Sequence, residues 1–171
     1  MKAKRRLTFI IIVLFQILVL VGLVGFNEAT LAFGKTVVLQ TVPVDPRDIF
    51  RGDYVMLRYE ISTLSNIPGL PMVKEGDKAY VRLEQRDDVW EATYVSGTPR
   101  EDWAFFIAGD VTDVRDNRIS MEYGIEAYFV PEGEGRAIER ADDLKVRVTI
   151  DRSGKAVIKN LIVDGETFQL R

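Results

Sequence analysis

The hydrophobic pattern sets one long segment apart from the rest of the chain. Residues 7–26 form a run of twenty in which only Thr8 and Gln16 are polar and none is charged. A helix of this length is roughly 30 Å long, the thickness of the hydrocarbon core of a bilayer. A helix on the surface of a water-soluble domain has one polar face, and this run has none. The pattern therefore predicts a transmembrane helix over residues 7–26.

From residue 35 onward the apolar positions alternate with polar ones, a period typical of strands. The alternation is clearest in residues 54–61, where Val55, Leu57, Tyr59 and Ile61 share one face, and both faces are expected to be covered. Residues 62–75 show no period and predict a long loop. Further strands are expected at 36–42, 78–84, 90–95, 103–114, 118–123, 144–150, 156–163 and 167–170, with one short helix at 134–143.

Turn signals separate these runs. Asp164-Gly165 is a strong two-residue hairpin signal, and turns are also expected at 86–88 and 116–117. Gly-Asp pairs begin at Gly52, Gly76 and Gly109, each just before an apolar or alternating run. Gly and Asp both favour tight turns, so each pair is predicted to start a strand.

The order of elements predicts a mainly β protein in two parts. Residues 1–34 would hold a basic tip, the transmembrane anchor and a short tether. Residues 35–171 would form an exported antiparallel β-barrel or sandwich-like domain with one short helix, because many short strands must close on one another to bury their apolar faces.

Charge gives the expected orientation and partners. The cations at positions 2, 4, 5 and 6 precede the apolar run, which predicts a cytoplasmic N-terminus and a domain on the opposite side of the membrane, in the periplasm or at the cell surface. A cleaved signal peptide is the alternative, because Thr30-Leu31-Ala32 ends in a small residue. Residues 1–34 hold four of the 23 Lys and Arg and one of the 26 Asp and Glu, so the remainder has a net charge of −6. Such a surface repels nucleic acid.

The composition restricts the chemistry. The chain has neither His nor Cys, which removes the commonest general base, the thiolate nucleophile and the usual zinc ligands. Its serines stand in turns without a lysine motif, and the spacing of Asp45, Asp48 and Asp53 is not that of a calcium loop. We therefore expect no catalytic residue, no metal and no cofactor, although an envelope hydrolase that uses Asp/Glu pairs remains an alternative.

Two windows, residues 45–61 and 123–133, concentrate polar and aromatic side chains that suit an anionic, peptide or glycan ligand. The same acids and arginines would serve equally as turn caps and ion pairs within a scaffold. The candidate binding residues are Asp45, Arg47, Arg51, Asp53, Tyr54, Arg58, Tyr59, Tyr123, Glu126, Tyr128 and Glu132. A module that binds cell-wall glycan or lipid headgroups could use Tyr54, Tyr59, Tyr128 and Trp103.

Residues 52–59 match Gly-Asp-Tyr-x-x-Leu-x-Tyr, and the chain resembles the bacterial GDYXXLXY family. Residues 43–47, 123–133 and 155–165 resemble its members as well. The resemblance implies a membrane-anchored protein, often encoded beside or fused to a multi-helix membrane protein, and it implies no catalytic residues. The chain is also, more weakly, similar to type I signal peptidases. It lacks their serine nucleophile, because Asp45 stands at the position where that serine would be.

These observations lead to one main functional expectation. The chain is expected to be a membrane-anchored, extracytoplasmic β-domain and a non-enzymatic accessory subunit of an integral membrane protein. Its expected partners are the bilayer and that membrane protein. The alternatives are an envelope hydrolase, a glycan- or lipid-binding module and a degenerate signal-peptidase-like protein.

Overall fold

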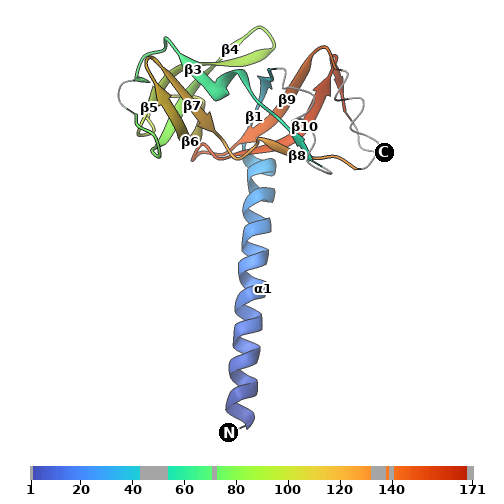
Figure 1. Ribbon diagram of the computed structural model, residues 1–171. Helices are drawn as coiled ribbons and strands as arrows, with labels where there is room; N and C mark the ends of the chain where they lie inside the picture. Colours follow the sequence, from blue (N-terminus) through green and yellow to red (C-terminus); the bar gives the residue numbers. More distant parts are fainter. Residues whose placement is uncertain (1, 43–53, 71–72, 132–137, 139–140, 169–171) are drawn as a thin grey trace.

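The structure is a computed structural model that describes residues 2–42, 54–70, 73–131, 138 and 141–168. A single long helix, α1 (Lys2–Phe33), carries a compact set of strands at its C-terminal end. Figure 1 shows this helix leaving the strands as a straight stem with the N-terminus at its far end. We call α1 the stem and the β-rich part from residue 35 onward the head.

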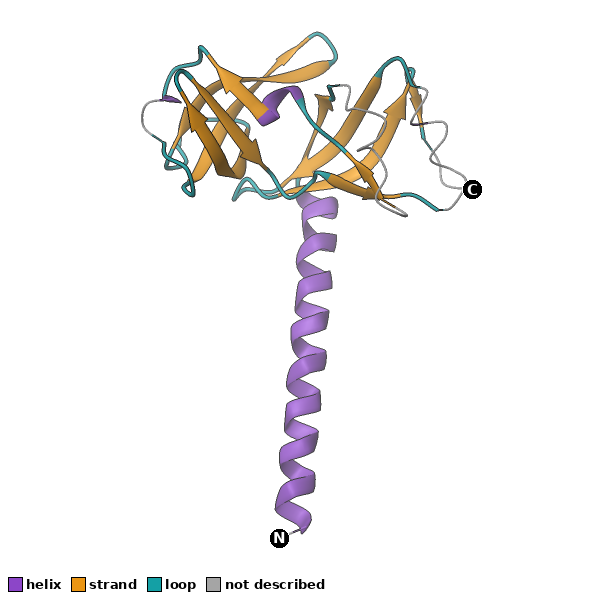
Figure 2. Ribbon diagram, in the orientation of Figure 1, coloured by secondary structure: helices purple, strands orange, loops and turns teal. Residues whose placement is uncertain are grey.

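The described part of the head contains eleven strands in three sheets, all paired antiparallel (Figure 2). A four-stranded sheet has the order β1-β9-β10-β11, a two-stranded sheet pairs β2 with β8, and a five-stranded sheet has the order β3-β7-β6-β4-β5. The bounds are β1 Lys35–Gln40, β2 Tyr54–Met56, β3 Thr63–Ser65, β4 Lys78–Arg86, β5 Val89–Ser96, β6 Phe106–Arg115, β7 Arg118–Glu122, β8 Ala127–Phe129, β9 Leu144–Ile150, β10 Ala156–Val163 and β11 Glu166–Thr167.

The three sheets close on one another around a common core. The amide of Ala108 in β6 donates to the carbonyl of Gly154 next to β10 at 2.9 Å, and Thr41 just after β1 forms an isolated bridge with Tyr59. The head is thus a nearly closed, barrel-like arrangement of antiparallel sheets. Side chains that contact no solvent at its centre come from all the long strands and include Leu39, Val81, Ile107, Val146 and Leu161.

The strands and turns agree with most of the sequence pattern. The hairpins at 87–88, 116–117 and 164–165 are two-residue turns, and their first residues, Asp87, Asp116 and Asp164, all have φ near +50°. Aspartate tolerates this left-handed conformation better than most residues. Gly76-Asp77 also forms the predicted turn, because Gly76 has φ +84° and the Asp77 amide donates to the Lys74 carbonyl at 3.0 Å.

The strand predicted over residues 54–61 is shorter than expected. Only β2 is regular, and residues Glu60–Ser62 form a 3-10 turn in which the Ser62 hydroxyl accepts a hydrogen bond from the Tyr59 amide at 3.2 Å. The alternating burial persists, since Val55, Leu57, Tyr59 and Ile61 are all buried. The opposite face, which we expected to be covered, is half exposed at Tyr54. The stretch predicted as loop also contains β3.

Gly109 does not begin a strand, contrary to the prediction, because it lies inside β6. A Cβ atom at this position would come within 2.6 Å of the Glu122 carbonyl oxygen and 2.7 Å of the Tyr123 ring. The glycine therefore allows the close approach of β7 and of Tyr123, rather than a turn. The Gly52-Asp53 pair lies outside the described residues.

The sequence predicted two helices, at 134–143 and at 7–26. Of the short helix expected at 134–143, Ile138 is helical and buried, while 134–137 and 139–140 lie outside the described residues. Within the part of the chain that the structure describes, no helix combines the length and apolar character needed to cross a membrane. The span expected over residues 7–26 stays a prediction.

The stem joins the head without a flexible linker. Residues 27–33, expected as part of a tether, continue α1 to Phe33, and Gly34 alone separates it from β1. The Gly34 amide donates to the Thr30 carbonyl at 2.9 Å, and Thr30 is buried. A Cβ atom on Gly34 would lie 2.5 Å from both the Thr30 carbonyl oxygen and the Thr149 methyl. The joint therefore requires glycine.

We expect Gly34→Ala to lower the free energy of unfolding of the head by about 1–3 kcal/mol, because the added methyl overpacks a joint made partly of backbone atoms. Chemical unfolding followed by tryptophan fluorescence measures this change. Gly97→Ala is the matched control, since a Cβ there meets nothing within 4 Å. Equal midpoints for the two variants would show that the joint is loose.

Candidate functional site

The two windows that the sequence nominated lie beside each other in the described residues. Strand β2 pairs with β8, so that Tyr54 faces Phe129 in the register, and the Leu57 amide donates to the Glu126 carbonyl at 2.7 Å. We call this junction of residues 54–62 with residues 123–129 the motif seam. Five nominated residues, Asp45, Arg47, Arg51, Asp53 and Glu132, lie outside the described residues.

Tyr59 and Tyr123 cross the motif seam in opposite directions. The Tyr59 hydroxyl donates to the Ile125 carbonyl at 2.6 Å, and the Tyr123 hydroxyl donates to the Ile61 carbonyl at 2.6 Å. Both rings are buried, with 1% and 6% of their surface exposed. Each phenol thus holds the backbone of the opposite segment, and the reading of these two residues as ligand contacts gives way to a structural role.

The environment keeps both phenols protonated. Burial raises the pKa of Tyr59 and of Tyr123 far above the ordinary value, and the nearby Glu126 carboxylate raises the pKa of each further. A phenol that stays neutral remains a donor to the carbonyl it faces. Burial also raises the pKa of Tyr128, which is only partly covered. Tyr59, Tyr123 and Tyr128 are therefore poor proton-transfer groups near neutral pH.

Glu126 shapes the turn that leads into β8. Its Oε1 atom accepts a hydrogen bond from the Tyr123 amide at 2.6 Å, and Gly124 between them has φ +77°. A carboxylate that accepts a backbone N–H three residues earlier in the chain closes a tight turn. One oxygen of Glu126 is thus committed to the scaffold, while the side chain still borders the groove described next.

An open groove of about 470 Å³ runs along the outer side of the motif seam. Its wall combines one guanidinium, two carboxylates and several hydroxyl groups, a lining suited to a polar partner or ligand. It is formed by Met56, Leu57, Arg58, Ser62, Thr63, Thr112, Ser120, Met121, Glu122 and Glu126. Among the described residues, no cluster of three or more acidic side chains could hold a metal ion.

The sequence reasoning found part of this groove and missed the rest. Arg58 and Glu126 were nominated, whereas Thr112, Ser120 and Glu122 come from β6 and β7 and were not. Polar residues on a strand that alternates normally are indistinguishable from other solvent-facing positions. For Tyr59 a signal did exist, because it alternates with Val55 and Leu57 and therefore falls on the buried face.

An aromatic pair is exposed at one end of the motif seam. Tyr54 and Phe129 meet edge to face, with ring centroids 5.6 Å apart and an interplanar angle of 72°. About half of each side chain is exposed (49% and 50%). Large aromatic residues that remain this accessible are common at the centres of protein interfaces. We call Tyr54 and Phe129 the aromatic pair.

The fold and the motif seam together define a class: a β-rich head, nearly closed, mounted directly on a long N-terminal helix. Within that class, the chain belongs to the GDYXXLXY family, whose model, described as GDYXXLXY protein, matches residues 16–161 and so includes part of the stem and most of the head. No curated protein matches the chain, and no solved structure matches it.

Proposed function

We propose that this protein is a membrane-anchored β-domain that acts as an accessory subunit of an integral membrane protein. The observation that supports the anchor is the exposure, on every side, of the part of the stem far from the head. Phe9, Ile10, Ile11 and Ile12 are each more than half exposed. Four consecutive helical positions, about 100° apart, go round the whole circumference. No side of this segment packs against the head.

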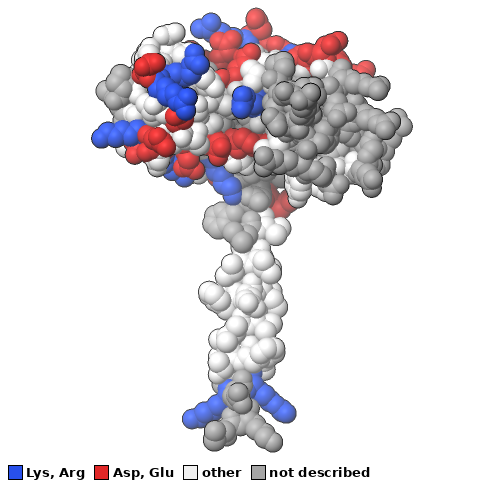
Figure 3. Space-filling view, viewed as in Figure 1, with Lys and Arg blue, Asp and Glu red and all other residues white. Residues whose placement is uncertain are grey.

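A solvent of low polarity accounts for this surface better than water does. Twelve large apolar side chains are exposed between Phe9 and Val24. At about 1.5–3 kcal/mol each, their burial would be worth on the order of 20 kcal/mol. Figure 3 shows the middle of the stem without charge, between a basic tip and a head that carries both signs of charge, with red atoms only where the stem meets the head. This charge distribution supports a cytoplasmic tip and a head on the opposite side of the membrane.

The rigid joint supports a partner within the same membrane. Because Gly34 is the only residue between α1 and β1, the head is held at a fixed height and orientation above the end of the stem. Anchoring two proteins in one bilayer raises their effective concentration, so a small contact suffices for association. The aromatic pair offers such a contact, and the rest of the motif seam fixes the strands that carry it.

A photo-crosslinking residue placed at Tyr54 or at Phe129, in the full chain in its native membrane, is expected to capture one multi-helix membrane protein. Combining Tyr54→Ala with Phe129→Ala should reduce co-purification of that protein at least tenfold, since interface aromatics often contribute about 2 kcal/mol each. Val114 in β6 is the control site, because it is apolar and 38% exposed but lies away from the motif seam. Equal capture at Val114 and Tyr54 would reject the interface.

The groove supplies a second candidate function. One arginine beside two carboxylates and several hydroxyls suits a hydroxylated ligand such as a glycan. In that case Arg58→Gln and Glu122→Gln would abolish retention of the protein on cell-wall glycan, whereas the aromatic-pair variant would not. If the same groove variants instead abolish capture of the membrane protein, the partner docks through the groove.

A further inference from the structure

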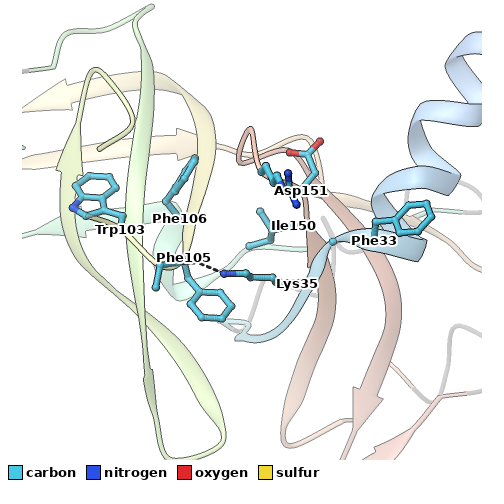
Figure 4. A pocket seen from close by; sticks show the side chains of 10 residues that line it. Phe33, Lys35, Trp103, Phe105, Phe106, Ile150 and Asp151 are labelled. Carbon is cyan, nitrogen blue, oxygen red and sulfur yellow. Dashed lines mark hydrogen bonds between the residues drawn. The ribbon is translucent and has the colours of Figure 1, made fainter. Parts of the chain in front are cut away.

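A second hollow lies where the stem enters the head. It has a volume of about 320 Å³ and is bordered by Phe33 at the end of α1, Lys35 at the start of β1, the segment Trp103–Phe106 and the turn that begins at Ile150. Figure 4 shows the aromatic side chains on one side and Asp151 and Phe33 on the other, with Lys35 between them. We call it the stem pocket. Nothing in the motif seam contributes to it.

Two cations border the stem pocket. The Lys35 ammonium donates to the Ala104 carbonyl at 3.0 Å and lies 4.4 Å from the centre of the Phe105 ring, so its position is fixed (Figure 4). An ammonium has three N–H donors, and this carbonyl uses one of them. Arg152 is exposed in the turn on the opposite wall. Both side chains can therefore offer donors to a group in the pocket.

Among the described residues that border the stem pocket, Asp151 is the one carboxylate, and it is engaged by its own turn. Asp151 Oδ1 accepts hydrogen bonds from the Ser153 amide at 2.8 Å, the Ser153 hydroxyl at 2.6 Å and the Lys155 amide at 3.0 Å. Although burial acts in the opposite direction, these hydrogen bonds and the charge of Lys155 lower the pKa of Asp151. Asp151 thus stabilises the turn that presents Arg152, and the charges of the described residues that border the pocket sum to +1.

The stem pocket lies near the outer edge of the headgroup layer, given the proposed anchor. Eight positions lead from Phe26, where the apolar run ends, to Gly34. In a helix they span about 12 Å, which a tilt of roughly 40° reduces to about 9 Å, and the polar layer of a bilayer extends roughly 5–8 Å beyond the hydrocarbon core, so a strongly tilted stem brings the pocket to within a few Å of the phosphates. Phe33 is 89% exposed beside the pocket, where interfacial aromatics are favourable.

We propose that the stem pocket binds the phosphate of an anionic phospholipid headgroup in the leaflet nearest the head. Lys35 and Arg152 contact the phosphate oxygens, and Phe33 and the aromatic wall cover the glycerol backbone. This inference rests on the proposed membrane anchor. A lipid bound in the stem pocket also helps to fix the orientation of the head, because it ties β1 and the 151–154 turn to the membrane surface.

The test uses the full chain in mild detergent, titrated with phosphatidylglycerol and analysed by native mass spectrometry for retained lipid. We expect Lys35→Gln combined with Arg152→Gln to weaken lipid retention at least fivefold, and Lys35→Arg alone to preserve it. The control is Arg115→Gln with Arg118→Gln, which removes the same charge from the β6–β7 hairpin. The N-terminal cations also attract anionic lipid and are present in every variant. Lipid retention is therefore compared between variants.

Soluble glycerol phosphate, added at the same concentrations, distinguishes a lipid from a free anion. Competition by glycerol phosphate as strong as that by the lipid would overturn the assignment to a membrane lipid. Equal retention by the pocket variant and the hairpin control would overturn the site itself. A chain that is not recovered with membranes at all would instead reject the anchor, so the two failures are distinguishable.

Discussion

Tyr123→Ala and Tyr59→Ala are each expected to lower the free energy of unfolding of the head by about 3–5 kcal/mol. Each change removes a large buried ring and leaves an accepting carbonyl without its phenol donor. The corresponding phenylalanine variants keep the ring and should cost about 1–3 kcal/mol through the unsatisfied carbonyl alone. Urea unfolding of the full chain in detergent, followed by far-ultraviolet circular dichroism, measures the free energy of unfolding of the alanine and the phenylalanine variants.

Tyr54→Ala is the matched control for this prediction. It removes the same atoms from the same segment but from a side chain that is half exposed, so its effect on stability should be much smaller than that of Tyr59→Ala. If Tyr59→Ala and Tyr54→Ala shift the unfolding midpoint equally, the reciprocal hydrogen bonds do not hold the motif seam. If Tyr54→Ala loses partner capture but keeps normal stability, the Tyr54 side chain acts in binding and not in folding.

The same tyrosines predict how stability depends on pH. Burial raises the pKa of both phenols in the folded state, whereas in the unfolded chain they keep the ordinary tyrosine pKa of about 10. Their contribution to the free energy of unfolding is therefore fully present below about pH 10. As the pH rises above about 10, the unfolded chain loses these protons and the folded state does not, so stability falls. Tyr59→Phe and Tyr123→Phe should make this alkaline decline shallower than in the wild-type protein.

Two charges in the stem are expected to abolish stable membrane association. Leu14→Lys with Leu18→Lys places ammonium groups near the middle of the apolar run, where each costs about 2.5–3.5 kcal/mol on insertion scales and the lost leucines add to the cost. On the same insertion scales, the sixteen Leu, Ile, Val and Phe residues of the run favour insertion by only about 0.5 kcal/mol each, so the total cost is comparable to what the run gains. Extraction of membranes at alkaline pH should release this variant and retain the wild-type protein.

Leu14→Ala with Leu18→Ala controls for simple truncation of the two side chains. Alanine keeps the stem uncharged and favours a helix, so this variant should stay in the membrane fraction. Release of both variants would indicate that the stem packs against a protein groove through its side chains. Retention of the lysine variant would contradict the anchor.

Much of the fold could be predicted from the sequence because strand signals are local. Residues 144–150 alternate, and Asp164-Gly165 favours a tight turn whatever surrounds it. The 3-10 turn at 60–62 could not be predicted, because it depends on the Ser62 side chain competing with strand pairing. Gly109 was misassigned for a related reason: its requirement for glycine arises from Tyr123, a neighbour only in space.

For the candidate site, the sequence by itself determined which two segments matter and that residues 7–26 are apolar on all sides, since both follow from residue type and spacing. Only the tertiary structure decided which of those side chains are accessible. Tyr59 and Tyr54 stand five residues apart in one motif, yet one is buried and holds Ile125 while the other is half exposed against Phe129. Exposure depends on what packs above a side chain, and in this head those neighbours come from strands distant in sequence.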